Sequence, residues 1–241
     1  MGLTSENVAE EFGITRETMD TMATNSHKKA AAAQADGRLG GEITPYETIM
    51  KDKDGNETKV MVDKDDGIRA TTTVAGLAKL KPAFKKGGTT TAGNSSQVTD
   101  GASCVLLARR DVATRNGCRI YGRIVSFAVA GVPPKIMGIG PAYAIPAALQ
   151  NCGLTVPDID IFEINEAFAS QASYCVNKLG VPAEKLNPKG GALALGHPLG
   201  MTGSRMICTL MSELERTQKR FGLVSMCIGT GMGACGIFER E

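Results

Sequence analysis

The sequence lacks tryptophan, has only two histidines, and has seven cysteines at irregular spacing among its 241 residues. An odd number of cysteines without a CxxC pair is a poor disulfide framework. Because free cysteines persist in a reducing environment, we favour a reducing compartment. His27 and His197 are the only imidazoles that could join the cysteines as ligands, so we expect no zinc site. No apolar run is long enough to cross a bilayer and no apolar signal segment opens the chain, so we expect no membrane span.

An excess of charge of either sign is also absent. Lys and Arg number 27 and Asp and Glu 25, for a net charge of +2. Because binding to a phosphate backbone needs a strong basic excess, we do not expect nucleic acid as the main partner. The hydrophobic share of 42% is ordinary for a globular protein, and the length suits one large domain or two modest ones.

Residues 1–98 are polar and rich in loop signals, and we predict that they form one unit, more a cover than a core. The pattern predicts a short helix ending at Phe12 and a longer helix capped by Thr15. Two strands, 42–49 and 58–62, flank a polar stretch with an Asp-Gly turn signal, which predicts a hairpin.

Residues 99–241 show a different pattern, in which strand and helix signals alternate. The predicted strands are 120–130, 159–164, 221–227 and 234–238; the predicted helices are 141–150, 166–179 and one after residue 203; 190–203 is a predicted glycine-rich loop. This order, resembling βαβαβ, indicates a layered α/β domain.

Three short segments carry candidate chemistry at the ends of such elements, where open α/β folds place active sites. Asn165 follows an apolar strand, His197 lies in the glycine-rich loop, and Cys227 ends a strand before three glycines. A neutral imidazole can act as a base near pH 7. Free backbone amides beyond Cys227 can bind an oxyanion and lower the thiol pKa. A Cys, a His, an Asn and free amides together suit acyl transfer through thioesters.

Each of these residues also has an ordinary structural interpretation. A glycine-flanked histidine is about as often structural as catalytic, and a strand-end cysteine is usually a small core residue. An asparagine ahead of a helix is usually an N-cap. The residue types by themselves therefore leave both interpretations open.

The order of the motifs resembles that of the thiolase family. The segments are Asn-Glu-Ala-Phe at 165–168, GGALALGHPLG at 190–200 and CIGTGMG at 227–233, with further matches at 92–102 and 137–141. Segments 79–84 and 160–164 look like the peroxisomal type of 3-ketoacyl-CoA thiolase. The resemblance implies a thiolase-like layered α/β fold. It further implies that residues 1–98 are a loop domain covering CoA, that 99–241 are the C-terminal thiolase domain, and that the N-terminal thiolase domain is missing.

The resemblance also implies site residues. His197 matches the histidine that activates the nucleophile, and Cys227 matches the acid/base cysteine that exchanges a proton with the acetyl α-carbon. Asn165 matches the residue that holds an oxyanion-site water, and the amide of Gly229 contributes to the second oxyanion site. The positions matched to CoA or to the acyl pocket are Met1, Arg69, Phe84, Ala92, Ser96 and Phe168. CoA and 3-ketoacyl-CoA would be substrates, so no cofactor or metal is implied.

The sequence departs from the family pattern at the nucleophile. A Cys-Ser-Ser-Gly or similar segment is absent, and Cys104 falls where the family has a small residue. We therefore expect a fragment of a β-oxidation acyltransferase that is inactive by itself. The alternative is a non-catalytic acyl-CoA-binding or scaffold protein. Within the enzyme class, the nearest rival is a condensing synthase for acetoacetyl-CoA.

The resemblance implies a peroxisomal location and a homodimeric parent enzyme. The chain shows no targeting signal for this compartment, because its last residues, Phe238 to Glu241, are not the peroxisomal tripeptide. Loss of a domain that packs on this one would expose an apolar face, so poor solubility or oligomerisation is expected.

Overall fold

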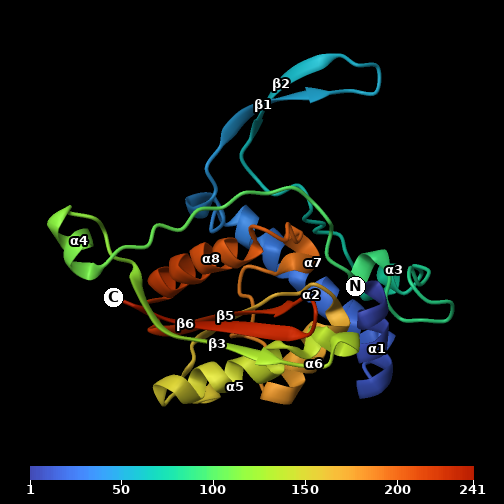
Figure 1. Ribbon diagram of the computed structural model, residues 1–241. Helices are drawn as coiled ribbons and strands as arrows, with labels where there is room; N and C mark the ends of the chain where they lie inside the picture. The colour runs from blue at the N-terminus through green and yellow to red at the C-terminus, as the bar shows by residue number, and fades with distance from the viewer.

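A four-stranded mixed sheet forms the centre of the computed structural model, which describes residues 1–241 (Figure 1). The strand order is β3 (Gly122–Gly131), β6 (Met232–Arg240), β5 (Phe221–Ile228) and β4 (Ile161–Ile164). β4 and β5 are parallel, whereas the β5–β6 and β3–β6 pairs are antiparallel. The predicted layered α/β fold is therefore present, with a sheet that is more antiparallel than a βαβαβ order implies.

Helices cover both faces of this sheet, with α8 on one side and α5 on the other (Figure 1). The α-helices are α1 (Gly2–Phe12), α2 (Arg16–Ala35), α3 (Val74–Leu77), α4 (Arg110–Arg115), α5 (Pro141–Cys152), α6 (Ala169–Leu179), α7 (Ala192–Leu195) and α8 (Thr202–Thr217). The 3₁₀ helices are η1 (Gly40–Glu42), η2 (Ala92–Asn94), η3 (Pro134–Ile139) and η4 (Val156–Asp158). The predicted cap of α2 is confirmed, because the Thr18 N–H donates to the Thr15 hydroxyl at 3.2 Å.

Two helices were not predicted. α7 lies inside the segment predicted as a glycine-rich loop, where Ala192–Leu195 supplies four good helix formers between two glycines. α4 follows an extended apolar segment and is only Arg110–Arg115 long. Both are too short to show helical periodicity, so the sequence pattern does not reveal them.

The main core lies between α5, α6 and the sheet. Its largest fully buried members are Ile145, Ile159, Phe162, Ile164, Leu223 and Ile237. A second cluster on the opposite face packs Met206, Leu210 and Leu214 of α8 onto the sheet. Their spacing of four residues puts them on one helix face, as an amphipathic helix covering a sheet requires.

The first two helices belong to the core. Met19 and Ala23 of α2 are fully buried and pack with Ala169 of α6 and Leu193 of α7. The prediction that residues 1–98 are more a cover than a core is therefore wrong for α1 and α2. The sequence pattern did not predict the burial of α2, because the helix is polar overall and buries mainly small side chains. The boundary at residue 98 stays a prediction.

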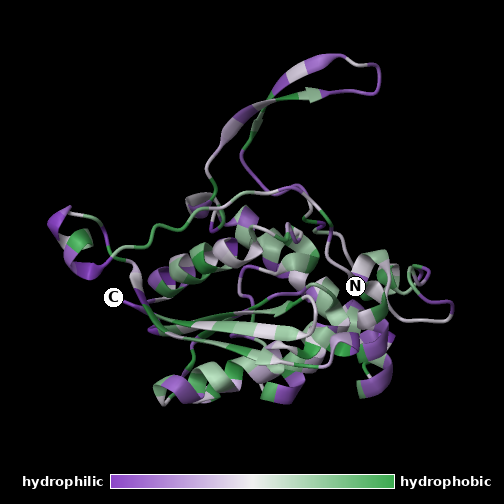
Figure 2. Cartoon of the chain, viewed as in Figure 1, coloured by the Kyte–Doolittle hydropathy of each residue, from purple (hydrophilic) through white to green (hydrophobic).

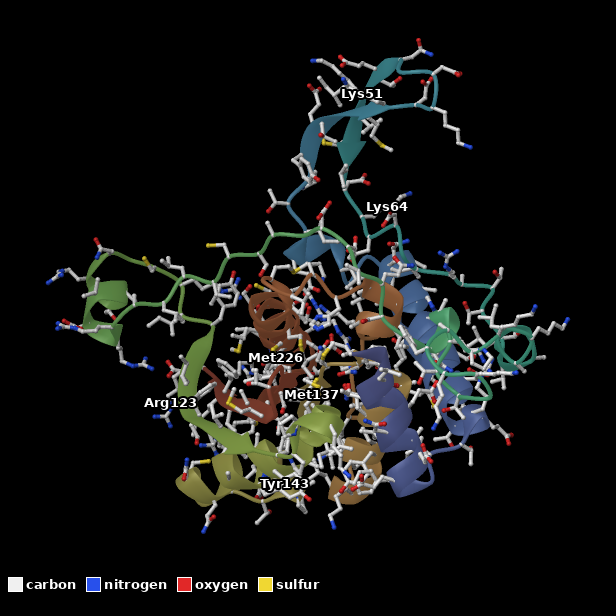
Figure 3. All side chains as sticks on the ribbon, turned by 45° about the vertical axis from the view of Figure 1, so that its right-hand side comes forward. Lys51, Lys64, Arg123, Met137, Tyr143 and Met226 are labelled. Carbon is white, nitrogen blue, oxygen red and sulfur yellow. The ribbon has the colours of Figure 1, made fainter.

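The predicted hairpin is confirmed and projects from the body of the molecule (Figure 1). It pairs β1 (Tyr46–Lys51) with β2 (Glu57–Val62) in antiparallel register. The Asp52 carboxylate accepts from the backbone N–H groups of Asp54 and Asn56, both at 2.9 Å, which closes the turn. The tip is hydrophilic (Figure 2), and Figure 3 places Lys51 there and Lys64 at the base.

An apolar surface is open to solvent beside α8. Leu106 and Leu107 are 84% and 68% exposed, on an extended segment that pairs with no strand. Between this segment, α8 and β3 lies a groove of about 930 Å³, called the apolar groove below. The edge strand β3 also exposes Phe127. The expected exposed apolar face is thus present, while none of the helices has the length and apolar content of a membrane span.

Candidate active site

Asn165 and Cys227 lie at the same end of the sheet. Asn165 directly follows β4, and its backbone N–H donates to the Ser225 carbonyl of β5 at 2.9 Å. Cys227 is two residues further along β5. Because β4 and β5 are parallel, their carboxyl ends meet at one edge of the sheet, where side chains can converge.

His197 reaches this edge from the loop between α7 and α8. Its backbone N–H donates to the Gln97 carbonyl at 3.0 Å, which fixes the loop against the segment after η2. The ring Nε2 lies 3.2 Å from Nδ2 of Asn165, and Nδ1 lies 2.7 Å from Oγ1 of Thr202. The structure therefore brings together two of the predicted site residues.

The surroundings keep the His197 ring neutral. Burial lowers the pKa of His197 below its usual value, and the positive charge of Arg205 lowers it further. A neutral imidazole at pH 7 can accept a proton, which is the property required of a base.

Cys227 joins the cluster through Gln171. The Cys227 thiol donates to Oε1 of Gln171 at 3.9 Å, and Nε2 of Gln171 donates to the Asn165 carbonyl at 3.3 Å. With the Gln171 amide turned over, its nitrogen donates to that carbonyl at 3.2 Å and its oxygen accepts from the Ala172 N–H at 2.7 Å, and the thiol then no longer faces Oε1. In either orientation Gln171, which is 1% exposed, lies buried between the two residues.

The environment of Cys227 corrects one expectation. Burial raises the pKa of its thiol to about 11, whereas the glycine-rich turn was expected to lower it. The side chain keeps some contact with solvent, but the surrounding protein removes enough water to disfavour a thiolate. A thiol that stays protonated at neutral pH is suited to give a proton to a stronger base.

The amide of Gly229 is available as a donor. Gly229 is exposed in the turn between β5 and β6, and its N–H has no hydrogen-bond partner in the chain. Thr230, with φ 73°, and Gly231, with φ 107°, complete this turn. The turn thus presents a free backbone N–H two residues beyond Cys227, as expected for an oxyanion donor.

Close glycine packing holds this turn in place. A Cβ atom on Gly233 would lie 2.1 Å from the Gly140 carbonyl carbon, so the two backbones touch. The motifs at 137–141 and 227–233 therefore pack directly on each other. Figure 3 labels Met137, in the first segment, and Met226, the residue just before the second, close together in that view, and η3 and β5 are in contact.

Glu166 anchors the loop that leads to His197, a role the sequence did not reveal. Its carboxylate accepts from Ser26 at 2.6 Å, from Asn187 at 2.8 Å and from the Leu193 N–H at 3.4 Å. These partners come from α2, from the segment before α7 and from α7 itself. Burial raises the pKa of Glu166, while its hydrogen bonds act in the opposite direction.

Two of the predicted pocket positions are in contact beside the start of α1. The rings of Phe84 and Phe168 pack edge to face, with centroids 6.1 Å apart and an interplanar angle of 82°. A Cβ on Gly2 would lie 2.2 Å from the Phe84 ring, so only glycine allows this approach. Met1 precedes Gly2 in the chain and is largely exposed, and the three positions are called the Met1, Phe84 and Phe168 cluster below.

The remaining predicted positions are peripheral to the cluster around His197. Ser96 donates its hydroxyl to the Ala167 carbonyl at 2.9 Å, which ties the segment after η2 to the start of α6. The Arg69 side chain is exposed, and its backbone N–H donates to Nδ1 of His27 at 3.1 Å. Ala92 is exposed at the start of η2. None of the three hydrogen-bonds to Asn165, His197 or Cys227.

Two contacts of the site were missed from the sequence, those of Gln171 and Thr202. Thr202 starts α8, five residues after His197, and Gln171 lies on α6, six residues after Asn165. Whether these side chains reach the site depends on how α6 and α8 pack against the sheet. A local sequence pattern does not predict that packing. No group of three His, Cys, Asp or Glu side chains is arranged to hold a metal ion.

Comparison with known proteins gives the same family over the whole chain. The model of the thiolase C-terminal domain matches residues 118–240, and that of the thiolase N-terminal domain matches residues 1–111. The chain is 64% identical over 240 residues to the peroxisomal 3-ketoacyl-CoA thiolase of Homo sapiens, covering 99% of this chain and 57% of that protein. It is 55% identical to the peroxisomal enzyme of Yarrowia lipolytica, covering 100% of this chain and 58% of that protein.

Solved structures agree with this result. The dimeric peroxisomal thiolase of Saccharomyces cerevisiae is 52% identical, with a TM-score of 0.88, and the match covers 100% of this chain and 59% of that one. Human mitochondrial 3-ketoacyl-CoA thiolase in complex with CoA is 40% identical, with a TM-score of 0.94 and the same coverage. The chain thus spans a little under three-fifths of the length of these relatives.

The match to the N-terminal model corrects one prediction. That domain was expected to be missing, but residues 1–111 match its model, so at least part of the domain is present and the prediction is wrong in that respect. The burial of α1 and α2 against α6 and α7 fits this result, since these helices are integral to the fold. With both domain models matched in order and the fold shared with solved relatives, the chain belongs to the thiolase family.

Proposed function

We propose that this chain carries one wall of the acyl-transfer site of a 3-ketoacyl-CoA thiolase, which cleaves 3-ketoacyl-CoA with CoA in fatty-acid β-oxidation. The observation that supports this most is the convergence of Asn165, His197 and Cys227 at the shared end of β4 and β5. The names of the peroxisomal relatives support the substrate class.

The chemistry follows from the proton states of these groups. A nucleophilic thiolate attacks the 3-keto carbon, the bond between Cα and Cβ breaks, and the acetyl-CoA enolate leaves. Cys227, protonated at neutral pH, gives its proton to the enolate carbon. His197, neutral at the same pH, takes the proton of the nucleophilic thiol before the attack. CoA then gives its thiol proton to the Cys227 thiolate and attacks the acyl-enzyme. The bond between the acyl carbon and the nucleophilic sulfur breaks, the shortened acyl-CoA leaves, and His197 returns its proton to that sulfur.

Two donor sets are available for the developing oxyanions. One is a water that we propose is held by Asn165, together with the N–H that Nε2 of His197 gains when it takes the proton of the nucleophile. The other includes the free N–H of Gly229. Donors fixed before the reaction stabilise a developing charge more than mobile water does, because they pay no cost of reorganisation.

We propose that the nucleophile is not one of the seven cysteines of this chain. Nε2 of His197 is hydrogen-bonded to Asn165 and Nδ1 is hydrogen-bonded to Thr202. No cysteine thiol of the chain is hydrogen-bonded to the ring. Cys104 is exposed on the extended segment beside the apolar groove. The nucleophile would then come from the part of the relatives that this chain does not span.

CoA is the proposed small-molecule partner, held along the Met1, Phe84 and Phe168 cluster and past Ser96, Ala92 and Arg69. The compartment we propose is the peroxisome, and the assembly a homodimer, on the strength of the relatives' names. A metal or cofactor plays no part in the proposed reaction.

The test has two arms. A thiolysis assay with a medium-chain 3-ketoacyl-CoA and CoA is expected to show no turnover for the 241-residue chain, as for His197→Ala. Calorimetry with CoA is expected to show binding that weakens in Arg69→Ala. The matched control is Arg109→Ala, an equally exposed arginine paired only with Asp111. Turnover that disappears in His197→Ala would overturn the statement about the nucleophile.

A non-catalytic acyl-CoA-binding protein is the second candidate, and it is favoured by the absence of a thiol at the His197 ring. The two functions differ when the N-terminal part of a peroxisomal relative is added. Recovery of thiolysis supports the enzyme, whereas CoA binding without any turnover supports the binding protein.

A further inference from the structure

The Thr202 hydroxyl occupies an unusual position behind the His197 ring. Thr202 is the first residue of α8 and is 1% exposed. Its Oγ1 lies 2.7 Å from Nδ1 of His197 and donates to the Pro198 carbonyl at 2.8 Å. The hydroxyl therefore connects the ring to the backbone of the loop that carries it.

The direction of each hydrogen bond in this chain of contacts can be assigned from the atoms involved. The amide nitrogen of Asn165 has only hydrogens to offer, so Nε2 of His197 must accept. A neutral imidazole carries one N–H, which then belongs to Nδ1. Nδ1–H donates to Oγ1 of Thr202, and the single hydroxyl hydrogen goes to the Pro198 carbonyl.

We propose that Thr202 is a positioning residue that holds His197 in the Nδ1–H tautomer and so keeps Nε2 unprotonated and able to take a proton in place of the Asn165 hydrogen bond. The catalytic meaning of this assignment depends on the proposed function, because only a base facing the substrate needs an unprotonated Nε2. The assignment itself concerns the ring and its neighbours, so it can be tested without turnover.

Two features make Thr202 suited to the task. Its backbone N–H donates to the Pro198 carbonyl at 3.0 Å, which fixes the residue in the first turn of α8. Its branched Cβ restricts χ1, so the hydroxyl has few other directions. No other group hydrogen-bonds to Nδ1 of His197.

A second observation identifies the alternative arrangement that this hydroxyl disfavours. Oδ1 of Asn165 is buried and has no hydrogen-bond partner. If Nδ1–H lost its acceptor, the ring could move its proton to Nε2, and the Asn165 amide could turn over to accept it. The surroundings of His197 therefore also permit the Nε2–H tautomer, and the Thr202 hydroxyl is the group that disfavours it.

Nuclear magnetic resonance tests this directly. Long-range ¹H–¹⁵N correlation spectra of the ¹⁵N-labelled chain at pH 7.5 distinguish the two tautomers of each histidine. The chain has only two histidines, and His197→Gln assigns the signals. We expect Nδ1–H in the wild type and in Thr202→Ser, which keeps the hydroxyl. In Thr202→Val the ratio of tautomers should shift roughly tenfold toward Nε2–H, as loss of one hydrogen bond implies.

Two results would overturn the proposal: a wild-type ring in the Nε2–H form, or an unchanged tautomer in a folded Thr202→Val. Thr202→Ala replaces the valine variant if circular dichroism shows that valine prevents folding. Failure of the thiolase function appears separately, as absence of CoA binding, and leaves the tautomer result intact. In an assembly that restores thiolysis, Thr202→Val should lower kcat with little change in KM, and Thr202→Ser should restore it.

Discussion

Nδ2 of Asn165 lies 3.2 Å from Nε2 of His197, although the two residues are 32 positions apart. One follows the edge strand β4 and the other a four-residue helix, and both approach the carboxyl ends of the parallel strands β4 and β5. The ring is thus held at both nitrogens, by an amide on one side and by Thr202 on the other. An imidazole fixed in this way has one orientation, while burial and the positive charge of Arg205 lower its pKa.

Because Asn165 contacts His197, a negative charge at position 165 should change the pKa of the imidazole. Asn165→Asp places a carboxylate beside Nε2 without changing the size of the side chain, and an adjacent negative charge favours the imidazolium. The pKa of His197 should rise by roughly one to three units. An NMR titration measures it, with Asn165→Ala as the uncharged control. If both variants titrate like the wild type, the two side chains are not in contact.

Glu163 should make the protein less stable as the pH rises. Burial raises its pKa to about 8 from 4.5, against the opposing charge of Arg205. The folded state therefore holds a proton that the unfolded state loses between pH 4.5 and 8. Over that window stability should fall by at most about 1.4 kcal/mol per pH unit. The free energy of unfolding in urea, measured from pH 5 to 8, should depend less on pH in Glu163→Gln than in the wild type. The same pH dependence in both proteins would show that Glu163 is ionised when folded.

His27 should have the opposite effect at acid pH. Burial, with help from the charge of Arg69, lowers the pKa of His27, and Nδ1 accepts from the Arg69 N–H. The unfolded histidine gains a proton below about pH 6.5 while the folded one stays neutral, so stability is complete above that pH and is lost as pH falls. His27→Gln keeps an acceptor and should lose less stability between pH 6.5 and 5. His197 acts in the same direction, so part of the slope should remain.

Glu166→Ala should destabilise the loop that carries His197. Ser26 and Asn187 would each lose a hydrogen bond to a buried carboxylate, at about 1–3 kcal/mol each, although Asn187 keeps the Ile164 carbonyl at 2.9 Å and Ser26 keeps that of Gly191 at 3.4 Å. We expect a loss of about 3 kcal/mol in urea unfolding, and a smaller loss for Glu166→Gln. The exposed Glu184→Ala serves as control. A loss below about 0.5 kcal/mol, the usual size for a surface substitution, would argue against an anchoring role.

The apolar groove should drive self-association. Leu106 and Leu107 are largely exposed beside it, on a segment without strand partners. Sedimentation velocity at increasing concentration should show dimers or larger species. The double variant Leu106→Ser, Leu107→Ser should shift these toward monomer, whereas Ile49→Ser on the hairpin should not. A wild-type chain that stays monomeric throughout would contradict this expectation.

Much of the fold was visible in the sequence because it depends on local patterns. The strand pattern at 159–164 and the Thr15 cap were sufficient to predict β4 and the start of α2. The turn with Asp54 and Gly55 predicted the hairpin. In contrast, the burial of α2 was missed, because a helix that packs through alanine and other small residues has little apolar periodicity.

The sequence alone determined that Asn165 and Cys227 lie at the ends of strands. The tertiary structure makes those strands, β4 and β5, parallel neighbours, so that their carboxyl ends share one edge of the sheet. Only the tertiary structure decided how His197 faces Asn165, that Thr202 and Gln171 complete the contacts, and that burial raises the pKa of the Cys227 thiol. The physical reason is the separation along the chain between the residues that determine each feature. Turns, caps and strand ends follow from neighbouring residues, whereas desolvation and hydrogen-bond partners depend on which distant helices pack over the site.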